Sequence, residues 1–345
     1  MAEAILEPEL PIVDPHHHLW HRMGAPPIAA GADVHPFTRV VARRPRYLLD
    51  ELLADLNSGH NVRATVFVQC GAMYRADGPE QLKPVGETEF VNGVAAMTAS
   101  GVYGEVRACA GIVGHADCLL GERIDEVLEA HLKVSDRFRG IRHSCSSDPD
   151  PAVLGPLARQ TPGLYLSDAF RAGYARLAKY GLSFDAWLLE PQLPELIDLV
   201  RKFPDTPVIL DHVGTPLGLG VYEGKREERF GVWKENIRTL ADLPNVNVKL
   251  GGLAMAFCNF PSFMSEPAAP STQLAAEWGP YLETCIEAFT PERCMFESNF
   301  PVDLGSCDYA TLWNAFKVFA KDHSADDKAD LFAGTAARVY RLDLN

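Results

Sequence analysis

The feature that most constrains the fold of this chain is an alternation of two sequence patterns along almost its whole length. Short β-rich runs occupy residues 10–16, 64–70, 105–113, 138–143, 182–188, 207–212, 246–251 and 294–299. Between them, apolar residues recur at helical spacing in residues 47–57, 87–99, 122–134, 168–180, 195–203, 232–243 and 274–289. Eight strands with intervening helices predict a single α/β domain over residues 1–345, folded as a closed (β/α)8 TIM barrel.

Three stretches do not fit this repeat and are predicted to be loop insertions: residues 24–46, 214–229 and 259–272, each rich in glycine, proline or charge. Loops of this length commonly carry function, and 214–229 is equally consistent with a lid and with a plain solvated loop. The tail, residues 322–345, is predicted to be a helix that closes the bottom or the side of the barrel. No G-x-G-x-x-G follows the first strand, which disfavours a dinucleotide-binding sheet.

Charge and composition exclude several classes of partner. The chain has 345 residues, and 32 basic against 46 acidic side chains give a net charge of −14. Without a block of lysine and arginine, binding to nucleic acid or to an anionic membrane is disfavoured. No apolar stretch approaches the roughly 20 residues of a membrane helix, and no secretory signal is visible, so we expect a cytoplasmic protein that acts on a small molecule. The eight cysteines include no C-x-x-C pair and are expected to be reduced and mostly buried.

The first strand carries the strongest chemical signal. In a TIM barrel the reactive groups come from the carboxyl ends of the strands. This strand ends in D-P-H-H-H-L-W at 14–20, and alternation along a strand points His16 and His18 the same way and His17 the opposite way. Two converging imidazoles can bind a divalent metal or donate hydrogen bonds to a substrate oxyanion, and their spacing does not separate these uses. A chance polar cluster is the plainer alternative.

The sixth strand ends on a further ionisable pair, in V-I-L-D-H-V-G at 208–214. Across the barrel mouth from the first strand, His212 could orient a substrate carbonyl, act as general base or complete a metal site. A core histidine with a backbone partner is the alternative. Asp211, one residue out of phase, is expected to face away from the mouth.

The eighth and fourth strands add charged groups. Glu297 and Asn299 share one face of C-M-F-E-S-N-F-P at 294–301. An isolated buried charge is costly, so Glu297 is either catalytic or salt-bridged to an arginine such as Arg142 or Arg107. The fourth strand, F-R-G-I-R-H at 138–143, brings Arg142 and His143 together, where the guanidinium could bind a substrate carboxylate or form a structural ion pair.

These motifs resemble the amidohydrolase superfamily, specifically the family-two amidohydrolases, a branch of TIM-barrel hydrolases that includes sugar lactonases and pyrone-dicarboxylate lactonase. The resemblance covers nearly the whole chain and is carried by D-P-H-H-H-L-W at 14–20, F-R-G-I-R-H at 138–143, L-D-H-V-G at 210–214 and L-F-A-G-T-A-A-R-V-Y at 331–340. It implies a hydrolase that opens a lactone. His16 and His18 would polarise the carbonyl or hold one divalent ion, with zinc the first choice, and His212 would lie beside them.

The same resemblance implies that Arg142 binds a carboxylate of the substrate, with His143 beside it, and the habit of the superfamily suggests a homodimer. Some members work without a metal, so a metal cofactor stays open. One departure concerns the eighth strand, which in the family usually ends G-S-D-W-P with an aspartate that activates water. This chain has E-S-N-F-P at 297–301.

An amide cannot accept a proton at neutral pH, so Asn299 is expected to orient or bind the substrate rather than act as base. The first choice for the base is Glu297, with a pKa raised by burial, and the second is Asp303, which could otherwise contact the substrate.

Three functions compete at this point. The leading one is hydrolysis of a lactone or related cyclic ester, with a carboxylate or His212 activating water. The second is a non-oxidative decarboxylase of an aromatic or muconate-type acid, as in other members of the superfamily. The third is a small-molecule binding protein without catalysis. Release of carbon dioxide, ring opening of a lactone, and silence toward both substrate classes distinguish them.

Overall fold

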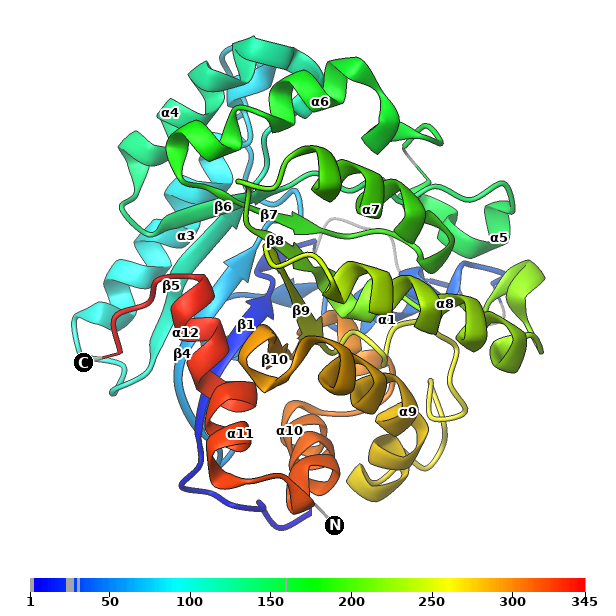
Figure 1. The fold of residues 1–345 in the computed structure, drawn as a ribbon. Coiled ribbons are helices and arrows are strands. Elements are labelled where there is room, and N and C mark those ends of the chain that lie inside the picture. The colour runs from blue at the N-terminus through cyan, green and yellow to red at the C-terminus, as the bar shows by residue number, and fades with distance from the viewer. Residues whose placement is uncertain (1–2, 23–27, 30–31, 159, 345) are drawn as a thin grey trace.

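Eight parallel strands form a barrel in a computed structural model that describes residues 3–22, 28–29, 32–158 and 160–344 (Figure 1). The strands pair in sequence order: β1 (Pro11–His17), β4 (Asn61–Val68), β5 (Arg107–Gly114), β6 (Phe138–Arg142), β7 (Ser183–Ala186), β8 (Val208–Leu210), β9 (Val246–Leu250) and β10 (Cys294–Phe296). The chain just after β10 closes the ring, because the N–H of His18 donates to Phe300 O (2.8 Å) and that of Asn299 to His16 O (2.8 Å). The predicted (β/α)8 TIM barrel is confirmed.

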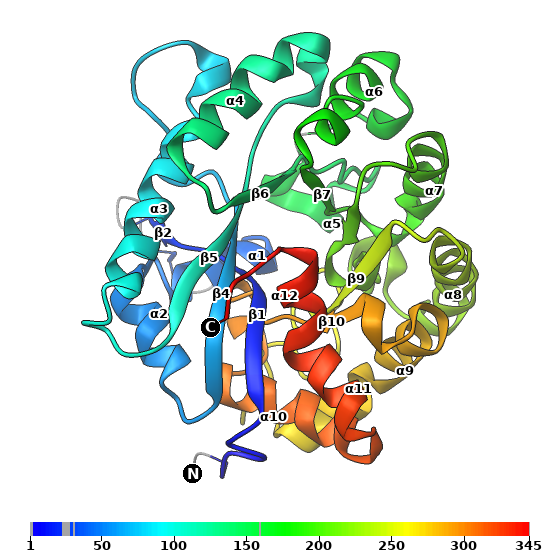
Figure 2. The same ribbon diagram turned by 60° about the vertical axis from the view of Figure 1, so that its left-hand side comes forward.

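The helices lie around the outside of the barrel (Figures 1 and 2). They are α1 (Pro36–Arg43), α2 (Leu49–Leu56), α3 (Val85–Ala99), α4 (Ile124–Val134), α5 (Pro151–Leu154), α6 (Asp168–Tyr174), α7 (Leu193–Lys202), α8 (Arg226–Ala241), α9 (Ser271–Phe289), α10 (Tyr309–Phe319), α11 (Ala325–Ala329) and α12 (Thr335–Val339). A small antiparallel ribbon pairs β2 (Trp20–His21) with β3 (Arg46–Tyr47). In α7, Pro194 begins the helix, Leu196 and Val200 are buried, and Arg201 and Lys202 complement the dipole at its end.

Two predicted elements differ from the structure for identifiable reasons. The run 207–212 predicts a strand through His212, but β8 ends at Leu210 because His212 (φ 57°) and Val213 (φ 47°) adopt left-handed backbone conformations. Helix α10 is absent from the predicted pattern. Its buried face includes Asn314 and Lys317, which interrupt the apolar spacing.

The tail closes the amino end of the barrel, as predicted, although as a broken helix. A π-helical turn (Asp330–Gly334) separates α11 from α12, and α12 lies beside β1 and β10 (Figure 2). Tyr340, directly after α12, is fully buried with Val66 and Met295 inside the barrel, and its hydroxyl donates to Asp185 Oδ2 (2.7 Å). Because hydrocarbon fills this end, the space for a ligand lies at the carboxyl ends of the strands.

Two further expectations bear on the environment of the chain. Among the described helices, none is both long enough and apolar enough to cross a membrane. All eight cysteines are free thiols, and all except the half-buried Cys70 are buried, as the absence of C-x-x-C pairs predicts. In the predicted insertion 24–46, residues 24–27, 30 and 31 lie outside the described residues, and the remainder contains α1.

Candidate active site

A cavity of about 780 Å³ opens at the carboxyl ends of the barrel strands. Side chains that follow different strands line it, among them His18, Gln69, His115, Arg142, His143, Trp187, His212 and Asn299. None of its lining residues comes from 214–229, so this predicted insertion does not cover the cavity. The ring centroids of His18 and His212 lie 4.9 and 4.6 Å from that of His16, so the structure brings these three imidazoles together.

Glu297 contacts the imidazoles of His16 and His212 from the side away from the cavity. Its Oε1 accepts hydrogen bonds from His212 Nδ1 (2.7 Å) and from the His212 backbone N–H (3.1 Å), and its Oε2 lies 2.8 Å from His16 Nδ1. Two adjacent glycines leave room for this arrangement. A Cβ on Gly251 would lie 2.4 Å from Glu297 Cγ, and one on Gly252 would lie 2.4 Å from His212 Nδ1. Glycine at both positions is therefore required by the packing of the pair.

The predicted raised pKa of Glu297 is wrong. Burial alone raises the pKa of this carboxyl, but the adjacent imidazoles of His212 and His16 outweigh it and hold the pKa at about 2. Glu297 is fully buried, is not among the residues that line the cavity, and directs both oxygens at histidines. The structure pairs it with imidazoles, while Arg107, one of its two proposed salt-bridge partners, donates instead to the carbonyl of Glu105 (2.8 Å).

His16 lies beneath the cavity floor rather than in its lining. Arg142 Nη1 donates to His16 Nε2 (3.3 Å), and a guanidinium has no acceptor to offer in return. Its Nδ1 lies between Glu297 Oε2 (2.8 Å) and the ammonium of Lys249 (3.2 Å). Burial and then the ammonium of Lys249 lower the pKa of His16 to about 4, so the ring is neutral at pH 7.

A buried charge network lies deeper in the barrel, and two of its members correct the sequence analysis. Lys249 Nζ donates to Asp185 Oδ2 (2.7 Å) and to Asp211 Oδ1 (3.0 Å). Asp211 thus faces into the barrel, contrary to the expectation, because it shares the face of Ile209, which packs inside the barrel two residues earlier, and the left-handed turn begins only at His212. Lys249 was not predicted at all. Burial lowers its pKa, but the two aspartates outweigh this effect and raise the pKa above the ordinary lysine value.

Asn299 connects the cavity to Asp303. His18 Nδ1 donates to the carbonyl of Val68 (2.7 Å), and His18 Nε2 lies 3.3 Å from Asn299 Oδ1. Asn299 Nδ2 donates to Asp303 Oδ1 (2.7 Å). Burial raises the pKa of Asp303 well above its ordinary value. Asp303 does not line the cavity, so the structure places it behind Asn299, where it fixes the amide.

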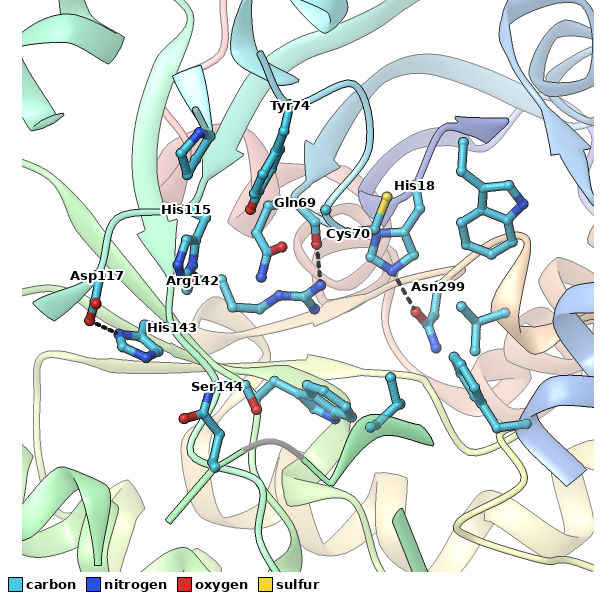
Figure 3. A pocket seen from close by; sticks show the side chains of 18 of the residues that line it. His18, Gln69, Cys70, Tyr74, His115, Asp117, Arg142, His143, Ser144 and Asn299 are labelled. Atoms are coloured by element: carbon cyan, nitrogen blue, oxygen red, sulfur yellow. Dashed lines mark hydrogen bonds and ion pairs between the residues drawn. The ribbon is translucent and has the colours of Figure 1, made fainter. Parts of the chain in front are cut away.

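Arg142 lies across the middle of the cavity, between His143 and His115 on one side and His18 and Asn299 on the other (Figure 3). Its Nη1 donates to Asp211 Oδ2 (3.4 Å) as well as to His16, and its Nη2 donates to the carbonyl of Gln69. These contacts hold the guanidinium in one orientation. His143 lines the cavity, as the fourth strand predicts, and His115 joins it from the end of β5. The same strand-end rule could have found His115.

Three side chains could hold a divalent metal. Donor atoms of His16, Asp211 and His212 all lie within 4.8 Å of one another, and two imidazoles with one carboxylate form a donor set that zinc accepts. His18, predicted as a ligand together with His16, is outside this group. Two cationic side chains already contact the same donors, because Lys249 lies against Asp211 and Arg142 against Asp211 and His16.

Known proteins resemble this chain both in sequence and in structure. The sequence model of the amidohydrolase family matches residues 13–342. Protein y4mH of Sinorhizobium fredii (strain NBRC 101917 / NGR234) is 32% identical over 340 residues, which cover 97% of this chain and 99% of the relative. The L-fucono-1,5-lactonase of Burkholderia multivorans (strain ATCC 17616 / 249) is 27% identical over 338 residues, 96% of each chain. A crystal structure of an amidohydrolase from Burkholderia multivorans with bound zinc superposes with a TM-score of 0.71 at 24% identity, covering 96% of this chain and 99% of that one.

Proposed function

Because the chain belongs to the amidohydrolase family of hydrolases, we propose that it hydrolyses a small lactone, with His212 as the base that activates water. One observation carries the proposal: the 2.7 Å hydrogen bond from His212 Nδ1 to Glu297 Oε1, directly below a cavity that His212 lines. This contact keeps a proton on Nδ1, so Nε2 is the nitrogen left to act as the base. The relatives named as L-fucono-1,5-lactonases support the reaction class.

The reaction follows from these groups. His212 Nε2 takes a proton from water while the water oxygen attacks the lactone carbonyl carbon. The tetrahedral oxyanion collapses, the ring C–O bond breaks, and the leaving alkoxide takes the proton back from His212 Nε2. The products are a carboxylic acid and a hydroxyl group on one open chain. In this scheme Glu297 is a positioning residue, which replaces the sequence-based choice of Glu297 as base.

Arg142 is the group that stabilises the oxyanion in this proposal. Arg142 is only 6% exposed, and the contacts of its guanidinium with Asp211 and the Gln69 carbonyl fix the orientation of that group before substrate enters. A preorganised cation in a nearly dry site lowers the energy of a developing negative charge by several kcal/mol. Nη1 uses its N–H groups on His16 and Asp211, Nε is buried, and Nη2 gives one N–H to the Gln69 carbonyl, so the second N–H of Nη2 is left for a single substrate oxygen, which we assign to the oxyanion. The proposal therefore departs from the carboxylate clamp that the resemblance implies.

The charges around the floor also favour an uncharged substrate. Lys249 and Arg142 are balanced by Asp211 and Glu297, with Asp185 as a third buried carboxyl. Of the outer lining residues, Asp117 and Glu80 are acidic and Arg22 is basic, so acids outnumber bases there. A lactone that already carries a carboxylate would meet these acids on entry, whereas a neutral lactone would not.

If zinc binds, His16, Asp211 and His212 would hold it, and the ion would supply a Lewis acid for the carbonyl oxygen.

The experiment compares the wild-type protein with His212→Asn, whose shorter amide can still donate to Glu297 but lacks a base at the Nε2 position. Ring opening of simple and hydroxylated lactones is followed by proton release, and aromatic acids are screened for carbon dioxide release. We expect the wild type to open lactones and His212→Asn to lose about 10³-fold in kcat. His21→Asn, an exposed histidine outside the cavity, is the matched control.

Carbon dioxide release without ring opening would replace the proposal with the decarboxylase. Silence toward both panels would favour the binding protein. Lactone turnover that His212→Asn leaves intact would overturn the assignment of the base.

A further inference from the structure

Two histidines form the end of the cavity opposite His18 and Asn299. His115 follows β5 and His143 follows β6, and both line the cavity (Figure 3). Their ring centroids are 5.2 Å apart with the planes at 73°. Neither ring belongs to the network of Glu297, His16 and Lys249, so the catalytic scheme above gives them no task.

The backbone fixes which nitrogen of His143 carries the proton. The N–H of Cys118 donates to His143 Nδ1 (3.2 Å), so Nδ1 must present its lone pair. Burial, followed by the neighbouring His115, lowers the pKa of His143 to about 4, and the ring is neutral at pH 7. The proton is therefore on Nε2, which makes His143 a hydrogen-bond donor at its free nitrogen.

The backbone fixes the opposite tautomer in His115. His115 Nδ1 lies 3.0 Å from the carbonyl of Arg142, and a carbonyl can only accept. Burial lowers the pKa of His115, so the neutral ring has its proton on Nδ1 and its lone pair on Nε2. Within the described part of the chain, no hydrogen-bond partner is recorded for Nε2 of either ring.

A third histidine holds this arrangement from behind. His131 Nε2 donates to the carbonyl of His115 (3.0 Å), and His131 Nδ1 accepts from Thr88 Oγ1 (2.8 Å). The peptide that carries His115 is thus tied down on the side away from the cavity. The acceptor and the donor are in place before a ligand arrives, which reduces the entropy lost on binding.

Acceptor and donor together favour an uncharged substituent that can both donate and accept a hydrogen bond. A carboxylate has no proton for His115, and an ammonium has no lone pair for His143. A hydroxyl group has both, and so does a pair of neighbouring hydroxyls. Asp117 Oδ1, which lies 3.8 Å from His143 Nδ1, further disfavours an anion at this end.

We propose that His115 and His143 form a hydroxyl-binding subsite for the substrate of the proposed reaction. Its carbonyl would lie toward His212 and Arg142, and its hydroxyls would lie toward the two histidines. This inference rests on the proposed function for the reaction, but it makes a separate claim about binding. A site built to hydrogen-bond a hydroxyl discriminates strongly against an analogue without one, because its polar atoms would remain unpaired.

The test measures binding without chemistry. Lactams are slow to hydrolyse, so a trihydroxylated δ-lactam and unsubstituted δ-valerolactam serve as probes in isothermal titration calorimetry. The variants are His115→Asn and His143→Asn, because an asparagine amide can replace the Nδ1 contact with the backbone while removing the ring nitrogen that faces the cavity. His21→Asn is the control, and thermal unfolding verifies that each variant is folded.

We expect the wild type and His21→Asn to bind the hydroxylated lactam ~100-fold more tightly than δ-valerolactam. Each cavity variant should reduce this ratio at least 10-fold, since only the hydroxylated probe loses a partner. Equal affinities in the wild type, or an unchanged ratio in both variants, would overturn the subsite. Lactone turnover is measured separately, so hydrolysis can fail while this binding preference holds, and the reverse.

Discussion

Two layers of polar side chains inside the barrel differ in how their members are paired. The deep layer consists of Glu297, His16, Lys249, Asp185 and Asp211, and the cavity layer consists of His212, His115 and His143. In the deep layer each ion finds an opposite charge or an imidazole within 3.0 Å, as between Lys249 and Asp185 or between Glu297 and His212. In the cavity layer, each of His212, His115 and His143 has Nδ1 engaged by the protein and no recorded protein partner for Nε2 in the described residues. A deep carboxylate fixes the proton position of His212, backbone groups fix those of His115 and His143, and in all three rings Nε2 remains for a ligand.

The largest effect on activity is expected at the contact between Glu297 and His212, where the two layers meet. Glu297→Gln keeps the size of the side chain but can turn an amide N–H toward His212 Nδ1, which would move the ring proton to Nε2. We predict a fall of about 10³- to 10⁴-fold in kcat with the fold retained, by analogy with loss of the carboxylate in a Ser-His-Asp triad. The exposed Glu283→Gln is the control. A loss smaller than 10-fold would show that the cavity layer does not depend on this contact.

The deep layer is expected to matter most for stability. Lys249→Met leaves Asp185 and Asp211 buried without their ammonium, and breaking a buried ion pair from one side costs about 3–5 kcal/mol. Chemical denaturation measures this difference in the free energy of unfolding. Lys321→Met, whose side chain is 70% exposed, is the control and should change stability by less than about 0.5 kcal/mol. A cost below 1 kcal/mol for Lys249→Met would mean that the network is not a structural unit.

His131, which holds the backbone of His115 from the side away from the cavity, makes the stability of the protein depend on pH. Burial lowers the pKa of His131 from 6.5 to about 4, so unfolding takes up a proton between these values. The stability from neutral His131 is fully present above pH 6.5 and is lost as the pH falls toward 4. His131→Gln can keep the bond to His115 but does not titrate, and it should flatten the decline of Tm on acidification. Neutral His131 contributes at most about 3 kcal/mol to the free energy of unfolding. If Tm falls with pH equally in both proteins, titration of His131 does not cause the loss of stability in acid.

The smallest effect is expected from metal removal. Lys249 and Arg142 already contact the donor atoms of His16 and Asp211, and a divalent ion would have to compete with both cations. Prolonged dialysis against a chelator, verified by elemental analysis, should therefore change kcat less than about 3-fold, because the base proposed here is His212. A loss of kcat of more than 100-fold that added zinc restores would show that catalysis requires the ion.

The sequence predicts the barrel and the rim of the site better than the interior. Alternating patterns locate all the barrel strands, and strand-end positions predict His18, Arg142 and His212 as cavity residues. Alternation counted from His212 misplaces Asp211, because His212 has a left-handed backbone, whereas Asp211 shares the inward face of Ile209.

The role of Glu297 could not be predicted, because its partners come from β1 and from the turn after β8, which only the closed barrel brings together. Lys249 carries a signal, a lone lysine in the apolar run V-N-V-K-L, but its partners on β7 and after β8 cannot be read locally.

The most direct test of the account is the tautomer of His212. Proton-coupled ¹⁵N NMR of histidine-labelled protein, with the His212 signals assigned by their loss in His212→Asn, shows which ring nitrogen carries the proton at pH 7. The account predicts a proton on Nδ1 and a free lone pair on Nε2 in the wild type, with the opposite tautomer in Glu297→Gln. A proton on Nε2 of the resting wild-type enzyme would contradict it.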